Sequence, residues 1–150
     1  MRALRYPPIC ARFIFMPGQF EDRTILRGGC HCGRVTYEVA GPIDGRVSAC
    51  NCSICIMKAY VHWIIPRERF RLLTPWEHLA TYTFNTHAAK HHFCPRCGVA
   101  PFYIARSDPD KIDVNLRCVD GVDLSKLEIQ HFDGRNWETA IKGDRGESSG

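Results

Sequence analysis

Short stretches in which apolar and polar residues alternate recur along the chain from about residue 24 onward. In the clearest of them, Val35, Tyr37 and Val39 alternate with polar residues until Gly41 and Pro42 end the run. Alternation with a period of two is typical of a strand with one buried face. Six more stretches rich in aromatic and β-branched residues are predicted as strands: 59–66, 67–73, 80–85, 101–106, 111–119 and 127–134.

Helical patterns are few, with one turn predicted near 76–79 and another near 137–141. Short strands between turns rich in Gly, Pro, Asn and Asp predict a mainly β fold built from small antiparallel sheets. Prolines and the lack of a sustained period predict a poorly structured N-terminal arm over residues 1–24. One domain over 25–141 and a disordered tail over 142–150 complete the expected organisation.

Length and composition are those of an ordinary globular protein, since 150 residues fit one domain and 45% are hydrophobic against 24% charged. No stretch of the sequence approaches the ~18 uninterrupted apolar residues that a membrane helix needs. The N-terminal apolar run is broken by Arg12 and bracketed by prolines, which makes it a poor secretory signal. We therefore expect a soluble, cytoplasmic protein in a reducing compartment.

Nine cysteines dominate the chemistry that the sequence offers. An odd number of cysteines in a reducing compartment, grouped as Cys-x-Cys and Cys-x-x-Cys, favours metal ligation by thiolates over a disulfide framework. Ligation by thiolates alone indicates zinc. The formal net charge is only +4, and seven zinc-bound thiolates would lower it further. A strongly basic protein that seeks nucleic acid is therefore not indicated.

Two of the cysteine groups can close one zinc site together. Cys30 and Cys32 form the first pair. Cys94 and Cys97 form the second, and four thiolates from two short pairs are a common tetrahedral structural set. Such a site stabilises the fold and leaves no coordination position for chemistry. A redox dithiol is the alternative for the second pair.

The third group, Cys50, Cys52 and Cys55, supplies three ligands without a fourth cysteine nearby. A zinc with three protein ligands and an open fourth position is typical of a catalytic or ligand-capturing site. The alternative is a closed structural site completed by a residue distant in sequence. Four residues are candidates for that fourth ligand: His31, His62, His87 and Cys118.

The segments GGCHCGRVTYEV, CNCSIC and FCPRCG resemble the glutathione-dependent formaldehyde-activating enzyme family, and the likeness runs from about residue 28 to residue 137. The resemblance implies a β-rich fold of small sheets organised around zinc, of the β-tent type, with two zinc ions per chain. It assigns a structural zinc to the four cysteines of the closed set, and the second zinc, where the thiol of glutathione binds, to Cys50, Cys52 and Cys55. The implied partners are glutathione or another small thiol and a small aldehyde.

The implied activity is that of a carbon-sulfur lyase that forms or cleaves S-hydroxymethylglutathione, or that of a glutathione carrier. The segment TYTFNTHAAKHHFCPRCGVAPFY, with Arg106 and Ser107, resembles more narrowly the branch of the family that contains centromere protein V. This likeness leaves a second hypothesis open, a non-catalytic zinc-binding interaction module. A third hypothesis is a zinc or thiol buffer whose second site releases its metal on oxidation.

Four residues outside the cysteine groups are candidates for substrate binding. Arg67, Arg69 and Arg71 would lie on one face of a strand over 67–73, where they could meet the carboxylates of glutathione. The alternative for these arginines is a solvated strand face. His62 lies in an apolar predicted strand, where it could donate a proton to a developing alkoxide or pack as a partly buried histidine.

Overall fold

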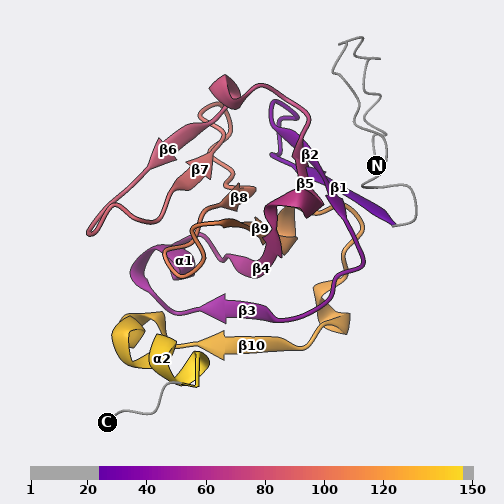
Figure 1. Cartoon of the computed structure of the whole chain (residues 1–150). Coiled ribbons are helices and arrows are strands. Elements are labelled where there is room, and N and C mark those ends of the chain that lie inside the picture. Colours follow the sequence, from indigo (N-terminus) through magenta and orange to yellow (C-terminus); the bar gives the residue numbers. More distant parts are fainter. Residues whose placement is uncertain (1–23, 147–150) are drawn as a thin grey trace.

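Ten short strands, two short helices and five 3-10 turns make up the described part of the chain, residues 24–146 of a computed structural model (Figure 1). The predicted mainly β fold with small sheets is confirmed. Residues 1–23 of the expected arm and residues 147–150 of the expected tail lie outside the described residues. None of the helices within residues 24–146 is long and apolar enough to cross a bilayer.

The first sheet has three antiparallel strands, in the order β1 (Ile25–Gly29), β2 (Thr36–Ala40) and β5 (Phe70–Leu72). Strand β2 contains the clearest alternating run of the sequence. Its neighbour β1 pairs with Val119 at Gly28. A side chain at Gly28 would lie 2.6 Å from the hydroxyl of Tyr37, so glycine allows this close approach.

The second sheet has five strands, in the order β10 (Ile129–Phe132), β3 (Val47–Cys50), β4 (Val61–Pro66), β9 (Lys111–Asn115) and β8 (Phe102–Tyr103). All neighbours are antiparallel except β10 and β3, which run parallel and side by side in Figure 1. The described sheets are thus mostly antiparallel, with one parallel pair. The long connection from β3 to β10 runs through the rest of the domain, which allows the two strands to point the same way.

A two-stranded hairpin, the helices and the 3-10 turns complete the fold. The hairpin pairs β6 (Ala80–Tyr82) with β7 (His91–Phe93). The helices are α1 (Ser53–Met57) and α2 (Trp137–Asp144). The 3-10 turns are η1 (Arg67–Arg69), η2 (Trp76–His78), η3 (Leu116–Cys118), η4 (Leu124–Lys126) and η5 (Gly134–Asn136). The helical turns predicted near 76–79 and 137–141 are thus present, and α1 is an addition to the prediction.

Residues 67–73 do not form the single strand that was predicted. They form the turn η1 and then the short strand β5. Pro66 ends β4 and stands directly before the turn η1. Two arginines of the turn bind loop carbonyls: Arg67 donates to the 109–110 loop at 3.1 and 3.2 Å, and Arg69 donates to Ala40 at 2.8 Å. These hydrogen bonds stabilise the turn, because they satisfy loop carbonyls.

Helix α2 extends to Asp144, so the expected start of a disordered tail at residue 142 is wrong. Ile141 is buried on this helix, and Asp144 forms an ion pair with Arg46. Burial of an apolar side chain and an anchored last turn hold the helix against the domain. The C-terminal segment is therefore part of the fold up to this point.

The five-stranded sheet has one apolar face and one face that bears polar side chains. In β4, Val61, Trp63 and Ile65 enter the hydrophobic core. In β9, Ile112 and Val114 enter the same core. Because strand side chains alternate between faces, the intervening residues of both strands lie on the opposite side of the sheet.

Phe102 joins the three sheets in the core. Its ring lies 4.7 Å from that of Phe70, 5.9 Å from that of Tyr37 and 5.6 Å from that of His92. Phe102 itself is fully buried on β8. One aromatic side chain thus contacts residues of all three sheets.

We expect Phe102→Ala to lower the free energy of unfolding by about 3–5 kcal/mol, because it leaves a cavity where the sheets meet. Chemical denaturation monitored by fluorescence would measure this loss. Leu73→Ala is the control, since Leu73 is 44% exposed and its loss should change stability by about 0.5 kcal/mol or less. Equal effects of the two substitutions would contradict this account of the core.

Candidate metal centres and the adjoining cavity

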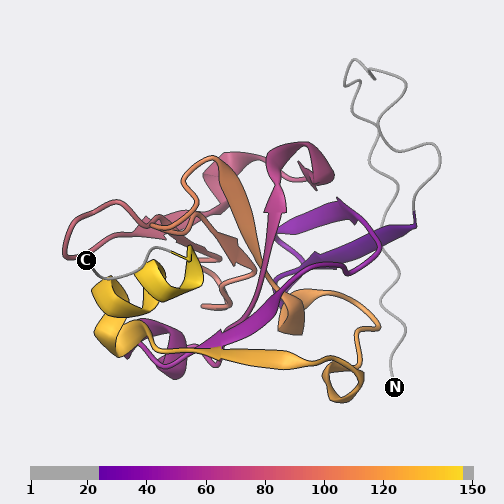
Figure 2. The same ribbon diagram turned by 60° about the horizontal axis from the view of Figure 1, so that its bottom comes forward.

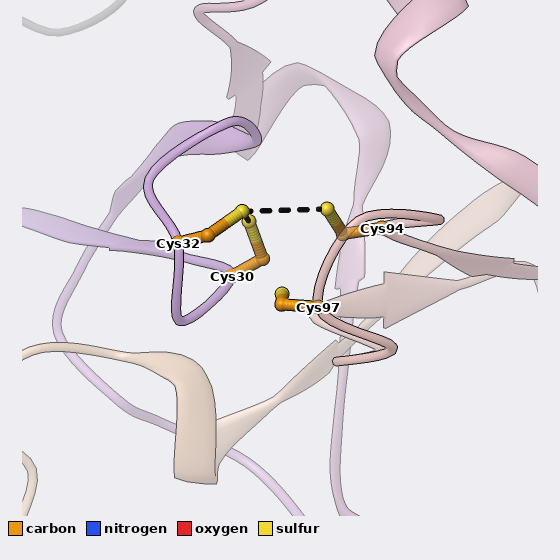
Figure 3. Close-up of side chains that lie close together, drawn as sticks. All are labelled: Cys30, Cys32, Cys94 and Cys97. Atoms are coloured by element: carbon orange, nitrogen blue, oxygen red, sulfur yellow. Dashed lines mark hydrogen bonds between the residues drawn. The ribbon is translucent and has the colours of Figure 1, made fainter.

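The structure brings Cys30, Cys32, Cys94 and Cys97 together, with all four sulfur atoms within 4.8 Å of one another. Figure 3 shows the sulfur atoms facing one another from two separate turns. The sulfur of Cys32 lies 3.6 Å from that of Cys30 and 3.7 Å from that of Cys94. Four sulfurs at about 2.3 Å from a zinc ion would be about 3.8 Å apart, so the donor set fits a tetrahedral ion.

The two turns that carry these sulfurs have the same backbone construction. The backbone N–H of Cys30 donates to the carbonyl of Val35, and that of Cys94 donates to Val99, each at 2.9 Å. A glycine with positive φ follows each pair, at 75° in the first turn and 76° in the second. A cysteine pair followed by a glycine therefore forms a similar turn at both places, and each turn supplies two of the four sulfurs.

The structure also brings Cys50, Cys52 and Cys55 together, with their sulfurs within 4.8 Å of one another. Cys50 ends strand β3, Cys52 precedes helix α1, and Cys55 is buried within that helix. The backbone N–H of Cys52 donates to the sulfur of Cys50 at 3.4 Å. A strand end followed at once by a helical turn thus gathers three sulfurs from six residues.

No fourth ligand for this set comes from the described residues. Within residues 24–146, no further His, Cys, Asp or Glu joins the three sulfurs within 4.8 Å. Three of the four candidates for a closed site have other contacts: His62 binds Asp113, His87 contacts Thr83, and Cys118 contacts a carbonyl at 3.9 Å. The fourth candidate, His31, is exposed and does not join the three sulfurs. The three-ligand zinc site stays a prediction.

The three thiols at this site influence one another's ionisation. Hydrogen bonding with Cys50 and Cys55 lowers the pKa of Cys52 to about 2. Hydrogen bonding with Cys50 and Cys52, together with burial, raises the pKa of Cys55 far above its usual range. One thiolate is therefore stabilised by its neighbours, and ionising the others requires a nearby cation. Soft sulfur donors at this spacing suit a zinc ion.

A cavity of about 720 Å³ adjoins the three-cysteine set. Its floor is the polar face of the five-stranded sheet, with side chains that alternate with the core residues: Ser48, Cys50, His62, Ile64, Tyr103, Lys111, Asp113 and Phe132. The loop between β6 and β7 forms one wall, through Phe84 and Ala89. Figures 1 and 2 place the tip of this hairpin on the same side of the molecule as α1 and α2. The volume of the cavity is in the usual range for sites that bind small molecules.

Cationic side chains also line the cavity. Five line it, namely Arg46, Lys111, Arg106, Arg135 and Arg145, against the acidic residues Asp108, Asp113 and Asp144. The guanidinium of Arg106 lies 3.3 Å from the ring centroid of Trp137 and donates to Glu138 at 2.9 Å. Arg135 and Arg145 donate to backbone carbonyls. Three of the five are in ion pairs, Arg46 with Asp144, Lys111 with Asp108 and Arg106 with Glu138. The lining still has more cationic than acidic side chains, which favours an anionic ligand.

Of the four predicted substrate residues, only one lines the cavity. His62 lines the cavity floor. Arg67, Arg69 and Arg71 do not line this cavity, because they lie on η1 and β5 on the other side of the core. Arg69 donates to the carbonyl of Pro42 at 2.7 Å, and Arg71 forms an ion pair with Glu38. The prediction that these arginines share a strand face near the site is wrong for that reason.

Several cavity residues have no clear signal in the sequence. Asp113 alternates with apolar neighbours in a predicted strand, so the pattern indicates an exposed position, whereas Asp113 is 1% exposed. Gly134 is in a turn signal, yet a side chain there would lie 2.9 Å from the Cβ of Cys52. Arg106 and Trp137 approach each other only through the fold. Only the contact of distant segments identifies these residues.

Comparisons with known proteins agree on one family. The family model of the glutathione-dependent formaldehyde-activating enzyme matches residues 25–134. A provisionally named glutathione-dependent formaldehyde-activating enzyme of Halomonas elongata is 31% identical over 84 residues, which are 51% of this chain and 54% of that protein. This chain thus spans about half the length of that curated relative.

A solved structure also resembles this fold. The crystal structure of a Rhodobacter sphaeroides protein matches with a TM-score of 0.63 and 32% sequence identity. The match covers 70% of this chain and 98% of that chain. The predicted family is confirmed by the family match, and the likeness to the centromere protein V branch stays a prediction.

We expect Gly134→Ala to remove one metal ion per chain, because the added methyl group would overlap the sulfur of Cys50. Native mass spectrometry would measure the loss. Gly143→Ala is the control, since nothing lies within 4 Å of a Cβ there. That variant should keep its metal and gain up to about 1 kcal/mol of stability from better helix propensity. Full metal content in Gly134→Ala would contradict the proposed crowding.

Proposed function

We propose a function for this chain on the premise that it belongs to the glutathione-dependent formaldehyde-activating enzyme family. The proposed function is that of a zinc-dependent carbon-sulfur lyase that forms and cleaves S-hydroxymethylglutathione, with glutathione carriage as its binding step. The observation that supports it most directly is the convergence of three cysteine sulfurs beside a cavity, without a fourth ligand from residues 24–146.

The proposal assigns different roles to the two cysteine sets. The set that includes Cys30 and Cys94 would hold a structural zinc ion, which links the turn before β2 to the turn after β7. Cys50, Cys52 and Cys55 would hold a second zinc ion beside the cavity. A zinc ion bound there would supply a position at which a small thiol is kept as its thiolate at neutral pH.

The cavity wall supports glutathione as the thiol. Glutathione carries two carboxylates, and these require cationic partners when they enter a partly enclosed site. Arg106, Arg135 and Arg145 line the cavity on the side of α2. A guanidinium forms paired hydrogen bonds with a carboxylate, so these residues are well suited to orient the ends of the molecule.

The residues that suggest centromere protein V also support a small-molecule site. The hypothesis of an interaction module requires aromatic residues on an outer surface. Phe84, His91 and Tyr103 instead line the cavity, and the ring of His91 stacks on that of Tyr103 at 4.8 Å. Tyr82 of the same segment is 51% exposed. Part of the segment that carries the likeness thus builds a cavity wall, which supports a small-molecule site.

We expect glutathione to change the visible absorption of the cobalt(II)-substituted protein in a saturable way. A new sulfur ligand alters the ligand field and the sulfur-to-metal charge-transfer bands. Cys52→Ser should abolish the change, whereas Cys118→Ser should preserve it, since Cys118 belongs to neither cysteine set. An unchanged spectrum up to millimolar glutathione in the unmodified protein would contradict the proposed function.

We expect Arg106→Met to weaken glutathione binding by about tenfold, which corresponds to the loss of one charge-assisted hydrogen bond. Methionine retains an apolar stem beside Trp137, so packing is largely conserved. Arg67→Met is the matched control, because Arg67 binds the 109–110 loop and does not line the cavity. Competition titrations would measure both affinities. A larger effect at Arg67 would favour the strand-face prediction made from sequence.

A further inference from the structure

A row of four polar side chains crosses the floor of the cavity. Ser48 on β3 is directly opposite His62 on β4, and Tyr103 on β8 is directly opposite Asp113 on β9. The two pairs meet in the middle, where Nδ1 of His62 lies 2.8 Å from Oδ2 of Asp113. All four residues line the cavity. The row therefore links adjacent strands of the sheet beneath the three-cysteine set.

The histidine and the aspartate of this row are buried but incompletely paired. His62 is 5% exposed and Asp113 is 1% exposed. Nε2 of His62 and Oδ1 of Asp113 have no hydrogen-bond partner among the residues that the structure describes. Burying polar atoms without partners costs free energy, and proteins keep such groups mainly where they serve a function. Among the residues that the structure describes, this is a buried pair with unpartnered polar atoms that also lines the cavity.

Contact with Asp113 determines what the histidine can do. A carboxylate that accepts a hydrogen bond from Nδ1–H of His62 leaves the lone pair on Nε2. The ring is held between aromatic neighbours, 4.7 Å from Tyr60 and 5.8 Å from Tyr103. Its orientation is therefore fixed, and Nε2 is the ring nitrogen that is left without a partner among the described residues.

The histidine is also close to the cysteine set. Cys50 is two residues after Ser48 on the same face of β3, and Ser48 is opposite His62. Cys50 and His62 are thus diagonal neighbours, a relation in which residues are about 7–8 Å apart. In an S-hydroxymethyl thiol, the hydroxyl oxygen is two bonds from the sulfur. The adduct of a thiol held at the cysteine set would therefore lie in the same part of the cavity as His62.

We propose that His62 is the acid-base residue that exchanges a proton with the adduct oxygen, and that Asp113 is the positioning residue that fixes its tautomer. This inference rests on the proposed function of the cysteine site. During cleavage, Nε2 takes the hydroxyl proton, and the O–H electron pair forms the carbonyl π bond. The C–S bond breaks and its electron pair stays on sulfur. The products are the aldehyde, the thiolate and an imidazolium, which returns its proton when the adduct forms.

The test compares His62→Gln with His92→Gln. His92 is a matched control because it is also buried with an unpartnered Nε2 within the described residues, but it does not line the cavity. Saturation-transfer NMR would measure exchange between formaldehyde and the adduct at saturating glutathione, and cobalt absorption would measure thiol binding. We expect His62→Gln to lose about 100-fold of the catalysed exchange with an affinity for glutathione changed by about threefold or less. His92→Gln should keep both properties.

Asp113→Asn provides a second test that does not require substitution of the histidine. An amide donates where the carboxylate accepts, so it should move the proton of His62 from Nδ1 to Nε2. We expect ¹⁵N chemical shifts to show this change of tautomer, and we expect kcat to fall while KM stays within about threefold. A purely structural role of Asp113 would change stability and leave kcat unchanged.

The outcomes separate this inference from the proposed function. Full exchange activity in a folded His62→Gln protein that binds glutathione would overturn the role of His62 and leave the proposed function in place. If His62→Gln fails to fold, wild-type kcat in Asp113→Asn would overturn the inference instead. Binding of glutathione by the unmodified protein without any acceleration of exchange would overturn both.

Discussion

Convergence of two cysteine turns is the constraint on which the remaining structure depends. The three sheets have three, five and two strands, and a two-stranded hairpin is marginally stable by itself. The turn with Cys30 and Cys32 leads into β2, and the turn with Cys94 and Cys97 follows β7. An ion shared by the four sulfurs would fix the hairpin to the first sheet, and Phe102 fills the space between them. Ligation and apolar packing thus act on the same junction.

The pleat of the five-stranded sheet places the residues that stabilise the core and the residues that line the cavity on opposite faces. Residues on one face form the core, and residues on the other face form the cavity floor. Trp63 and His62 are adjacent in sequence, yet they serve these two faces. Because the alternation is a property of every strand, one register determines both sets of positions. A slip of one residue in β4 would exchange a core tryptophan for a cavity histidine.

The sequence predicts the strands that have a clear local pattern, but not those that form only through contacts with distant segments. Residues 59–66 are rich in aromatic and β-branched side chains, residues 111–119 alternate, and both contain strands. Strand β3 was missed, since its residues Val47–Cys50 lack a run of β-branched or aromatic side chains and gain their partners from β4 and β10. The cysteine groups could be predicted from the sequence, because closely spaced cysteine pairs occur in few kinds of site. The arginines at 67–71 were misplaced because their partners are backbone carbonyls that no sequence pattern reveals.

The contrast between the two cysteine sets follows from how each is assembled. The closed set needs two turns from distant segments, and each turn supplies two sulfurs. The open set comes from one segment of six residues, and a single short segment covers only one side of an ion. Gly134 approaches the sulfur of Cys50 from η5, and it brings no side chain that could ligate or obstruct. The cavity adjoins the same sulfurs, so a ligand of the proposed second zinc ion would approach from the side that the segment does not cover.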